Sequence, residues 1–200
     1  MSNKKSPNKS VEFFFDIVSP ASYLAWTQLP KLERDTGAKI IYRPMFLPGI
    51  FEMAGNDTPI IVPAKAKWIF EDFKRFAKRY DVPFTMNDKF PLSSVYAMRG
   101  LNNFREHERF TKLVDEFYQA MWVNNEDIND PEIVIRIVND AGINPSEYQA
   151  AMNDPENKQA LMDITKEAVD RGIFGAPTFF VGDEMHFGQD RLDFVAEALG

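Results

Sequence analysis

The chain has 200 residues, of which 44% are hydrophobic and 26% are charged, so it describes one globular domain or one domain with a substantial insertion. Its net charge of −7 argues against a protein that binds nucleic acid or an anionic membrane. The chain has no cysteine and two histidines, His107 and His186, which excludes disulfide scaffolds, thiolate metal sites, iron–sulfur clusters, a cysteine nucleophile and a three-histidine zinc site.

The sequence shows neither a membrane span nor a signal peptide. No segment approaches the ~18 consecutive apolar residues that cross a bilayer. Residues 1–10 are polar and carry lysines, and the apolar run behind them is too short for a signal-peptide core. We therefore expect a disordered tail over residues 1–10, no membrane partner and, by default, a cytoplasmic location.

The beginning of the chain predicts a strand, a helix and a second strand. Residues 11–16 are aromatic-rich and end in a polar residue, which is typical of a buried strand. Ser19 and Pro20 form a helix start, with serine as the N-cap and proline in the first position. Residues 39–43 predict the next strand, closed by Pro44. So compact a β-α-β unit indicates parallel strands with a helical crossover.

The middle of the chain predicts a loop and then helices. Residues 44–66 hold four prolines and two glycines, a composition that indicates a long functional or mobile loop. Apolar side chains recur at helical spacing over residues 64–80, before a break at Val82-Pro83. Further helices are expected over residues 93–103, 106–123, 131–141, 146–152 and 157–172, with terminal glycines at 142 and 172.

The end of the chain predicts two short strands, residues 178–181 and 185–187, and a helix over residues 191–199. Neither strand-bearing part has enough strands to be stable alone, so we expect one four-stranded sheet interrupted by a helical insertion. This α/β architecture is a thioredoxin-like fold. Residues 11–63 and 173–200 would form the thioredoxin-like domain, and residues 64–172 the inserted helical domain.

Three segments carry a resemblance to known proteins: residues 14–24 (FFDIVSPASYL), 174–179 (FGAPTF) and 187–192 (FGQDRL). Residues 55–56, 63–65 and 122–128 also fit. Together, and in this order, they resemble the 2-hydroxychromene-2-carboxylate isomerases and the kappa-class glutathione transferases, which have a DsbA-like thioredoxin fold. The resemblance covers nearly the whole chain after the tail. It implies glutathione as cofactor, a small aromatic substrate and a homodimer.

Ser19 is the candidate catalytic residue. A serine that begins a helix directly after a strand lies where free backbone N–H groups and the positive end of the helix dipole favour an anion. Thioredoxin-like redox proteins keep Cys-x-x-Cys at this place, but residues 19–22 read Ser-Pro-Ala-Ser, so disulfide exchange is impossible. The resemblance implies that the Ser19 hydroxyl stabilises the thiolate of glutathione. The alternative is that Ser19 is only an N-cap.

Ala176 and Pro177 are candidates for holding the cysteinyl part of glutathione. Sequence statistics favour a trans bond before Pro177, whereas the thioredoxin-like pattern implies a cis bond. The backbone of Ala176 would then be free to pair with an extended peptide, as in strand addition. The alternative is a plain turn before a strand.

Four further residues are candidate glutathione contacts through the resemblance. Gln189 and Asp190 would bind the γ-glutamyl end, where a carboxylate meets an ammonium group. The kappa-class pattern has serine in place of Gln189, and an acid at the place of Asp190 is commonly an N-cap. Lys65 would pair with the glycyl carboxylate, although a lone lysine is normally solvated surface. Asn56 is the weakest of these candidates.

The remaining polar and aromatic residues suggest no metal site and no firm role. We interpret His107 as a surface residue within the charged run of residues 105–109, which we expect to form a solvated helix face. His186 is interpreted as a strand-face residue. Most aromatic side chains are expected in the core. Members of one set are candidates to line an apolar pocket for a flat substrate: Phe46, Phe51, Trp68 and Trp122.

The sequence supports one leading function and two alternatives. The first is a glutathione-dependent isomerase resembling 2-hydroxychromene-2-carboxylate isomerase and acting on an aromatic-degradation intermediate. In this family reaction the thiolate adds reversibly to the conjugated substrate, a bond rotates, and elimination returns glutathione. The second is a kappa-class-like transferase that conjugates glutathione to electrophiles. The third is a redox-inactive thioredoxin-like protein that binds a peptide partner.

Overall fold

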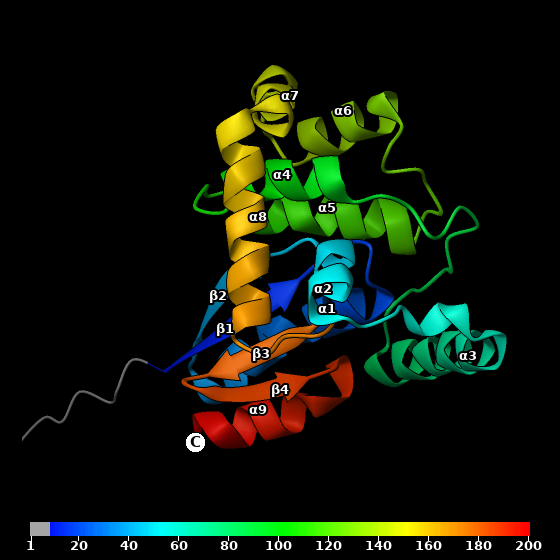
Figure 1. The fold of residues 1–200 in the computed structure, drawn as a ribbon, viewed down its shortest axis with the longest axis vertical. Coiled ribbons are helices and arrows are strands. Elements are labelled where there is room, and N and C mark those ends of the chain that lie inside the picture. The colour runs from blue at the N-terminus through cyan, green and yellow to red at the C-terminus, as the bar shows by residue number, and fades with distance from the viewer. Residues whose placement is uncertain (1–8) are drawn as a thin grey trace, which may run out of the picture.

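The computed structural model describes residues 9–200, which form one four-stranded sheet with helices on both sides (Figure 1). The strands are β1 (Ser10–Phe15), β2 (Lys39–Pro44), β3 (Thr178–Val181) and β4 (Glu184–Phe187). Their order is β2-β1-β3-β4. The first two strands are parallel, and β3 is antiparallel to both β1 and β4. The prediction of a single thioredoxin-like sheet assembled from the two ends of the chain is confirmed.

The predicted β-α-β unit is present. Its crossover is α1 (Pro20–Thr36), which begins after the N-cap Ser19 and ends at Gly37. Gly37 has a φ of 69°, a left-handed conformation that glycine adopts without steric cost. The helix therefore starts and stops where its local residue types predict.

The predicted loop over residues 44–66 is wrong for much of its length. It contains α2 (Leu47–Ala54) and the 3₁₀ helix η1 (Pro59–Ile61), and α3 (Pro63–Tyr80) begins before the predicted loop ends. Three of the four prolines, Pro48, Pro59 and Pro63, lie in the first turns of these helices, where a missing backbone N–H costs nothing, and Pro44 ends β2. Burial of Leu47 and Ile50 then stabilises α2 against the core.

The rest of the middle is helical, as predicted. It comprises α4 (Val95–Asn103), α5 (Phe110–Trp122), α6 (Pro131–Asp140), α7 (Pro145–Asn153) and α8 (Pro155–Asp170). In Figure 1, α4 to α7 lie above the sheet and α8 runs down from them towards it. The charged run of residues 105–109 forms turns before α5 instead of a helix face. The boundaries of the inserted domain, residues 64–172, stay a prediction.

The C-terminal part of the chain supplies the last two strands of the sheet, β3 and β4. Gly182 makes the β3–β4 turn with a φ of 60°. A short 3₁₀ helix, η2 (Gln189–Arg191), precedes α9 (Leu192–Leu199), which packs against α1. The predicted tail of residues 1–10 lies outside the described residues except for Lys9 and Ser10, and Ser10 already belongs to β1.

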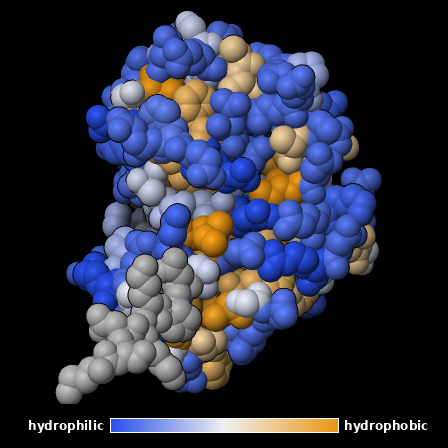
Figure 2. All heavy atoms as spheres, turned by 90° about the vertical axis from the view of Figure 1, so that its left-hand side faces the viewer, coloured by the Kyte–Doolittle hydropathy of each residue, from blue (hydrophilic) through white to orange (hydrophobic). Residues whose placement is uncertain are grey.

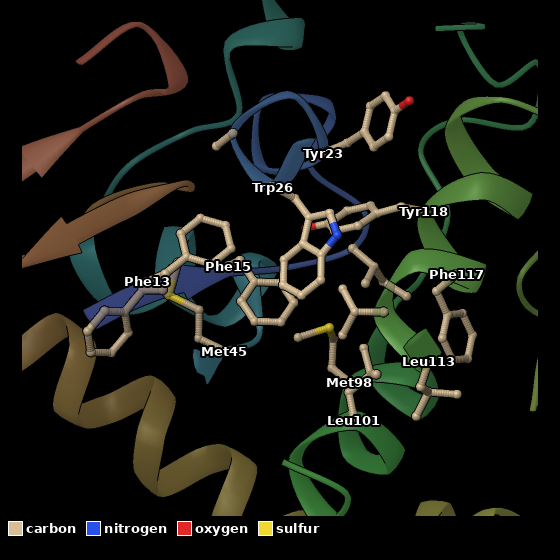
Figure 3. Close-up of a cluster of buried hydrophobic side chains, with 14 of the residues drawn as sticks. Phe13, Phe15, Tyr23, Trp26, Met45, Met98, Leu101, Leu113, Phe117 and Tyr118 are labelled. Carbon is tan, nitrogen blue, oxygen red and sulfur yellow. The ribbon is translucent and has the colours of Figure 1, made fainter. Parts of the chain in front are cut away.

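An aromatic cluster joins the sheet to the helices above it (Figure 3). The rings of Phe13 and Phe15 stack at 5.1 Å, and both lie against Trp26 of α1. Tyr118 of α5 contacts Phe15 and Trp26 from the helical layer. One continuous core therefore holds β1 and α1 in place, and with them the turn that carries Ser19.

The face of the molecule drawn in Figure 2 is mostly hydrophilic. On this face, hydrophobic side chains appear as separate spots among hydrophilic ones. Of the helices in residues 9–200, none has the length and apolar character needed to cross a membrane.

Candidate active site

Ser19 lies at the N-terminus of α1 and is almost fully buried, with 4% of its surface exposed. Its Oγ accepts a hydrogen bond from the backbone N–H of Ser22 at 3.1 Å and donates one to the carbonyl oxygen of Ala176 at 3.3 Å. Ser19 is therefore an N-cap, as the alternative interpretation expected. Its hydroxyl also meets the second motif, which an N-cap role does not require.

The segment before β3 approaches the serine through Ala176 and Pro177. The bond between them is cis, as the thioredoxin-like pattern implied. No backbone hydrogen bond pairs the N–H of Ala176 with another residue in the described part of the chain. The carbonyl oxygen of Pro177 accepts a hydrogen bond from Gly188 at 3.0 Å, which ties this segment to the third motif.

Gln189 and Asp190 lie in η2, next to this segment. The carbonyl oxygen of the buried Gln189 accepts a hydrogen bond from the Tyr80 hydroxyl at 2.9 Å. Asp190 is exposed and forms an ion pair with Arg191 at 2.6 Å. The N-cap interpretation of Asp190 is wrong, because the turn of η2 makes Arg191 the residue that precedes α9.

Asn56 lies between β2 and α3, and Lys65 lies in the first turn of α3. The Nδ2 of Asn56 donates to the carbonyl oxygen of Phe174 at 2.9 Å, so Asn56 supports the strand entry that contains Ala176. Lys65 is exposed in the first turn of α3. Its part in a glutathione site stays a prediction.

A groove of about 630 Å³ adjoins this cluster. It runs between α1, α3 and α9, and Tyr80, Gln189 and Asp190 are among its lining residues. Ser19 does not line it. The groove therefore borders the third motif and leaves the helix N-terminus as a separate part of the site.

Sequence reasoning missed Asp16, which lies between β1 and Ser19 and has no exposed surface. Its carboxylate accepts hydrogen bonds from the Val18 N–H at 3.0 Å, the Leu47 N–H at 2.9 Å and the Ser94 hydroxyl at 2.8 Å. Burial raises the pKa of Asp16 to about 6, and the three hydrogen bonds oppose this rise without cancelling it. The available signal was an acid at the end of a buried strand, three residues before the helix cap.

Two hydroxyls near this point, those of Ser22 and Tyr118, are buried and face each other. Burial, with a smaller contribution from the charge of Asp16, raises the pKa of Tyr118 well above its usual value. The indole of Trp122 donates to the carbonyl oxygen of Ile17 at 2.8 Å. The hydroxyl of Ser22, at the place of the second cysteine of a redox motif, is thus sealed from solvent.

The two histidines lie outside the cluster of Ser19 and Ala176. His107 is exposed, as expected, and its Nδ1 accepts from the Arg109 N–H. His186 lies on β4 with its side chain 9% exposed, which confirms a strand-face residue.

The aromatic residues considered for an apolar pocket differ in burial. Trp122 is fully buried in the core, whereas Trp68 is 60% exposed on α3. Phe46 and Phe51 are half-buried and pack against the core.

The arrangement suits the binding of a peptide-like anion. A hydroxyl and a helix N-terminus favour a negative charge at Ser19. The unpaired N–H of Ala176 offers an extended ligand a backbone hydrogen bond. The exposed carboxylate of Asp190 can meet a cationic group.

Comparisons with known proteins agree with this architecture. Residues 10–200 match the family described as DSBA-like thioredoxin domain. The chain is 33% identical to a 2-hydroxychromene-2-carboxylate isomerase of Sphingobium xenophagum over 199 residues, 96% of this chain and 98% of that protein. It is 28% identical to glutathione S-transferase kappa 1 of Homo sapiens over 206 residues, 96% of this chain and 91% of that protein.

A solved structure of a 2-hydroxychromene-2-carboxylate isomerase superposes with a TM-score of 0.86 at 26% identity, over 96% of this chain and 94% of that one. The similarity thus spans the sheet, the helical layer and the segments that meet at Ser19. These relatives are enzymes by name, an isomerase and a glutathione transferase. The chain is thus similar to kappa-class glutathione transferases, and it belongs to the DSBA-like thioredoxin domain family and, within it, to the 2-hydroxychromene-2-carboxylate isomerase family.

Proposed function

We propose that the protein is a glutathione-dependent isomerase that acts on a hydroxychromene carboxylate or a similar aromatic-degradation intermediate. The observation that carries the proposal is the Ser19 hydroxyl, which is held at a helix N-terminus against Ala176 in a chain without cysteine. A thiol used at this place has to come from a bound molecule. The proposal includes a homodimer and a cytoplasmic location.

Each part of glutathione has a candidate partner among these residues. The cysteinyl unit would pair with the free N–H of Ala176. The γ-glutamyl ammonium would meet Asp190, whose carboxylate is exposed. Lys65 would bind the glycyl carboxylate, and Asn56 would hold the strand entry that bears Ala176. This assignment uses both ends and the middle of the tripeptide.

Bound glutathione would supply a thiol nucleophile that adds reversibly to a conjugated substrate. The task of Ser19 is to lower the pKa of that thiol from about 8.5 towards 7, which requires about 2 kcal/mol. One hydrogen bond to a charged group contributes about 1.5–3 kcal/mol, and a helix N-terminus adds about 0.3–1 kcal/mol. At 3.3 Å the bond from Ser19 to Ala176 is long. The hydroxyl can therefore turn to a sulfur anion at low cost while Ser22 still donates to its oxygen.

Net transfer of glutathione to an electrophile is the second candidate, because relatives in Homo sapiens and Caenorhabditis elegans are named glutathione S-transferase kappa 1 at 28% and 29% identity. Both reactions would use the same thiol site. They differ in stoichiometry, since an isomerase returns its glutathione and a transferase consumes one molecule per turnover.

Two measurements test the proposal. Calorimetric titration with reduced glutathione should show binding at or below millimolar concentration, and the absence of binding would refute both candidates. A panel of chromene carboxylates and electrophiles is then assayed with limiting glutathione. Substrate turnover far in excess of glutathione supports the isomerase, whereas turnover that stops at one equivalent supports the transferase.

A further inference from the structure

The carboxylate of Asp16 fills the turn between β1 and α1. Its Oδ1 accepts from the Val18 N–H, and its backbone carbonyl oxygen accepts from the Ser19 N–H at 3.1 Å. Asp16 thus holds the backbone N–H groups of Val18 and Ser19, one through its carboxylate and the other through its carbonyl oxygen. The geometry of this turn determines where that hydroxyl points.

The second carboxylate oxygen joins the turn to the neighbouring helices. Oδ2 accepts from the N–H of Leu47, the first residue of α2, and from the hydroxyl of Ser94, the N-cap residue of α4. Tyr118 of α5 is the titratable side chain that faces this carboxylate. Within the described part of the chain, Asp16 forms no salt bridge with a lysine, arginine or histidine. The negative charge is therefore held by hydrogen bonds alone.

Such a charge is costly to bury. Burial raises the pKa of Asp16 to about 6, so the folded protein favours the proton more than an exposed aspartate does. A carboxylate without a cation therefore adds nothing to stability through its charge. Retention of an unfavourable buried group beside a reactive side chain is typical of functional sites.

Protonation of the carboxylate changes the turn directly. The ionised group offers acceptors to three donors, two of them backbone N–H groups. A proton on Oδ1 weakens the acceptor of the Val18 N–H, and a proton on Oδ2 weakens that of the Leu47 N–H. Each protonated form thus leaves one buried N–H poorly paired, either beside Ser19 or at the start of α2.

We propose that Asp16 is a positioning residue, whose ionised carboxylate holds the turn that presents the Ser19 hydroxyl to the ligand. The claim on the turn concerns the free protein. The claim on ligand binding rests on the proposed function, because it needs glutathione at Ser19. The two claims call for separate readouts.

The first readout is amide hydrogen exchange of the ligand-free protein, measured by NMR across the titration of Asp16. In the wild type, protection of the Val18, Ser19 and Leu47 amides should fall several-fold as the pH drops through about 6. In Asp16→Asn, which cannot ionise, protection should be independent of pH over this range. Asp163→Asn, an exposed acid of α8, should behave as the wild type. Protection that stays constant in the wild type would overturn the proposal.

The second readout is the affinity for S-methylglutathione, a ligand whose sulfur cannot ionise and so adds no titration of its own. The wild type should bind it several-fold more weakly below the pKa of Asp16 than above it, with a midpoint near 6. Asp16→Asn should bind weakly at every pH. An affinity that is flat in the wild type, or that falls equally in the variant, would show that Asp16 only supports the fold. If the ligand does not bind at all, the proposed function fails, and hydrogen exchange alone decides the role of Asp16.

Discussion

The Ser19 hydroxyl donates a hydrogen bond to the carbonyl oxygen of Ala176, 3.3 Å away, although 157 positions separate the two residues in the chain. Ser19 precedes the first helix, and Ala176 precedes the third strand. The antiparallel pairing of β1 and β3 brings them together, because Phe14 lies opposite Thr178. The site is thus assembled in the middle of the sheet, where the strands from the two ends of the chain pair.

Removal of the Ser19 hydroxyl should impair the bound thiol. In Ser19→Ala, the loss of one hydrogen bond to a charged group should raise the thiol pKa by about 1–2 units and lower turnover about 10- to 100-fold. Thiolate absorbance against pH measures the first effect, and initial rates measure the second.

A control for this variant separates chemistry from helix capping. Asn144 caps α7 through a bond to the Ser146 N–H at 2.9 Å, far along the chain from Ser19. Asn144→Ala should lose about 1 kcal/mol of stability, as should Ser19→Ala, but keep its activity. Equal turnover in the two variants would remove Ser19 from the mechanism.

Lys65 should matter only for ligands that carry the glycyl carboxylate. Lys65→Gln should weaken glutathione binding about 3- to 10-fold, the effect of one partly exposed ion pair. The neighbouring Lys67→Gln is the matched control and should bind normally. With γ-glutamylcysteine, which lacks the glycine, Lys65→Gln and the wild type should have equal dissociation constants by calorimetry. A loss of affinity for both ligands would place Lys65 elsewhere.

The Tyr80 hydroxyl should support the γ-glutamyl end of the site. Tyr80→Phe leaves the carbonyl oxygen of Gln189 without its donor at 2.9 Å, so the η2 turn that carries Asp190 should loosen. We expect the KM for glutathione to rise several-fold with little change in kcat. Tyr148→Phe removes a similar bond, to Ala97 at 3.0 Å, within the helical layer. It should lower stability by about 1 kcal/mol without changing the KM.

Asp16 should make stability depend on pH in a defined direction. Its pKa is about 6 in the folded protein against an ordinary value of 3.8, so between these values the folded state binds more protons than the unfolded chain. The free energy of unfolding should therefore fall as the pH rises through this window, by about 3 kcal/mol from this group.

Urea unfolding of the wild type and Asp16→Asn at several pH values measures this contribution, since the other titrating groups cancel in the difference. The stability of the variant relative to the wild type should increase with pH through the window and then level off. A difference that decreases with pH would contradict the assigned pKa.

Local residue patterns predicted most elements, but they failed in a segment rich in proline and glycine, which are common both in loops and at helix ends. The prolines and glycines of residues 44–66 suggested a loop, yet Pro48 lies in the first turn of α2 and Gly55 ends that helix. Both residue types are common at helix ends as well as in loops. The choice between them depended on burial of Leu47 and Ile50 in a core that distant segments build.

The sequence by itself determined the order of the strands and of most helices, the cap at Ser19 and the absence of any thiol, because these follow from residue type and short-range spacing. Only the tertiary structure decided that Ser19 meets Ala176, that Asn56 holds Phe174, and that Asp16 is buried without a cation. Such contacts join segments far apart in the chain, and they form only when the sheet and the helical layer close around one core.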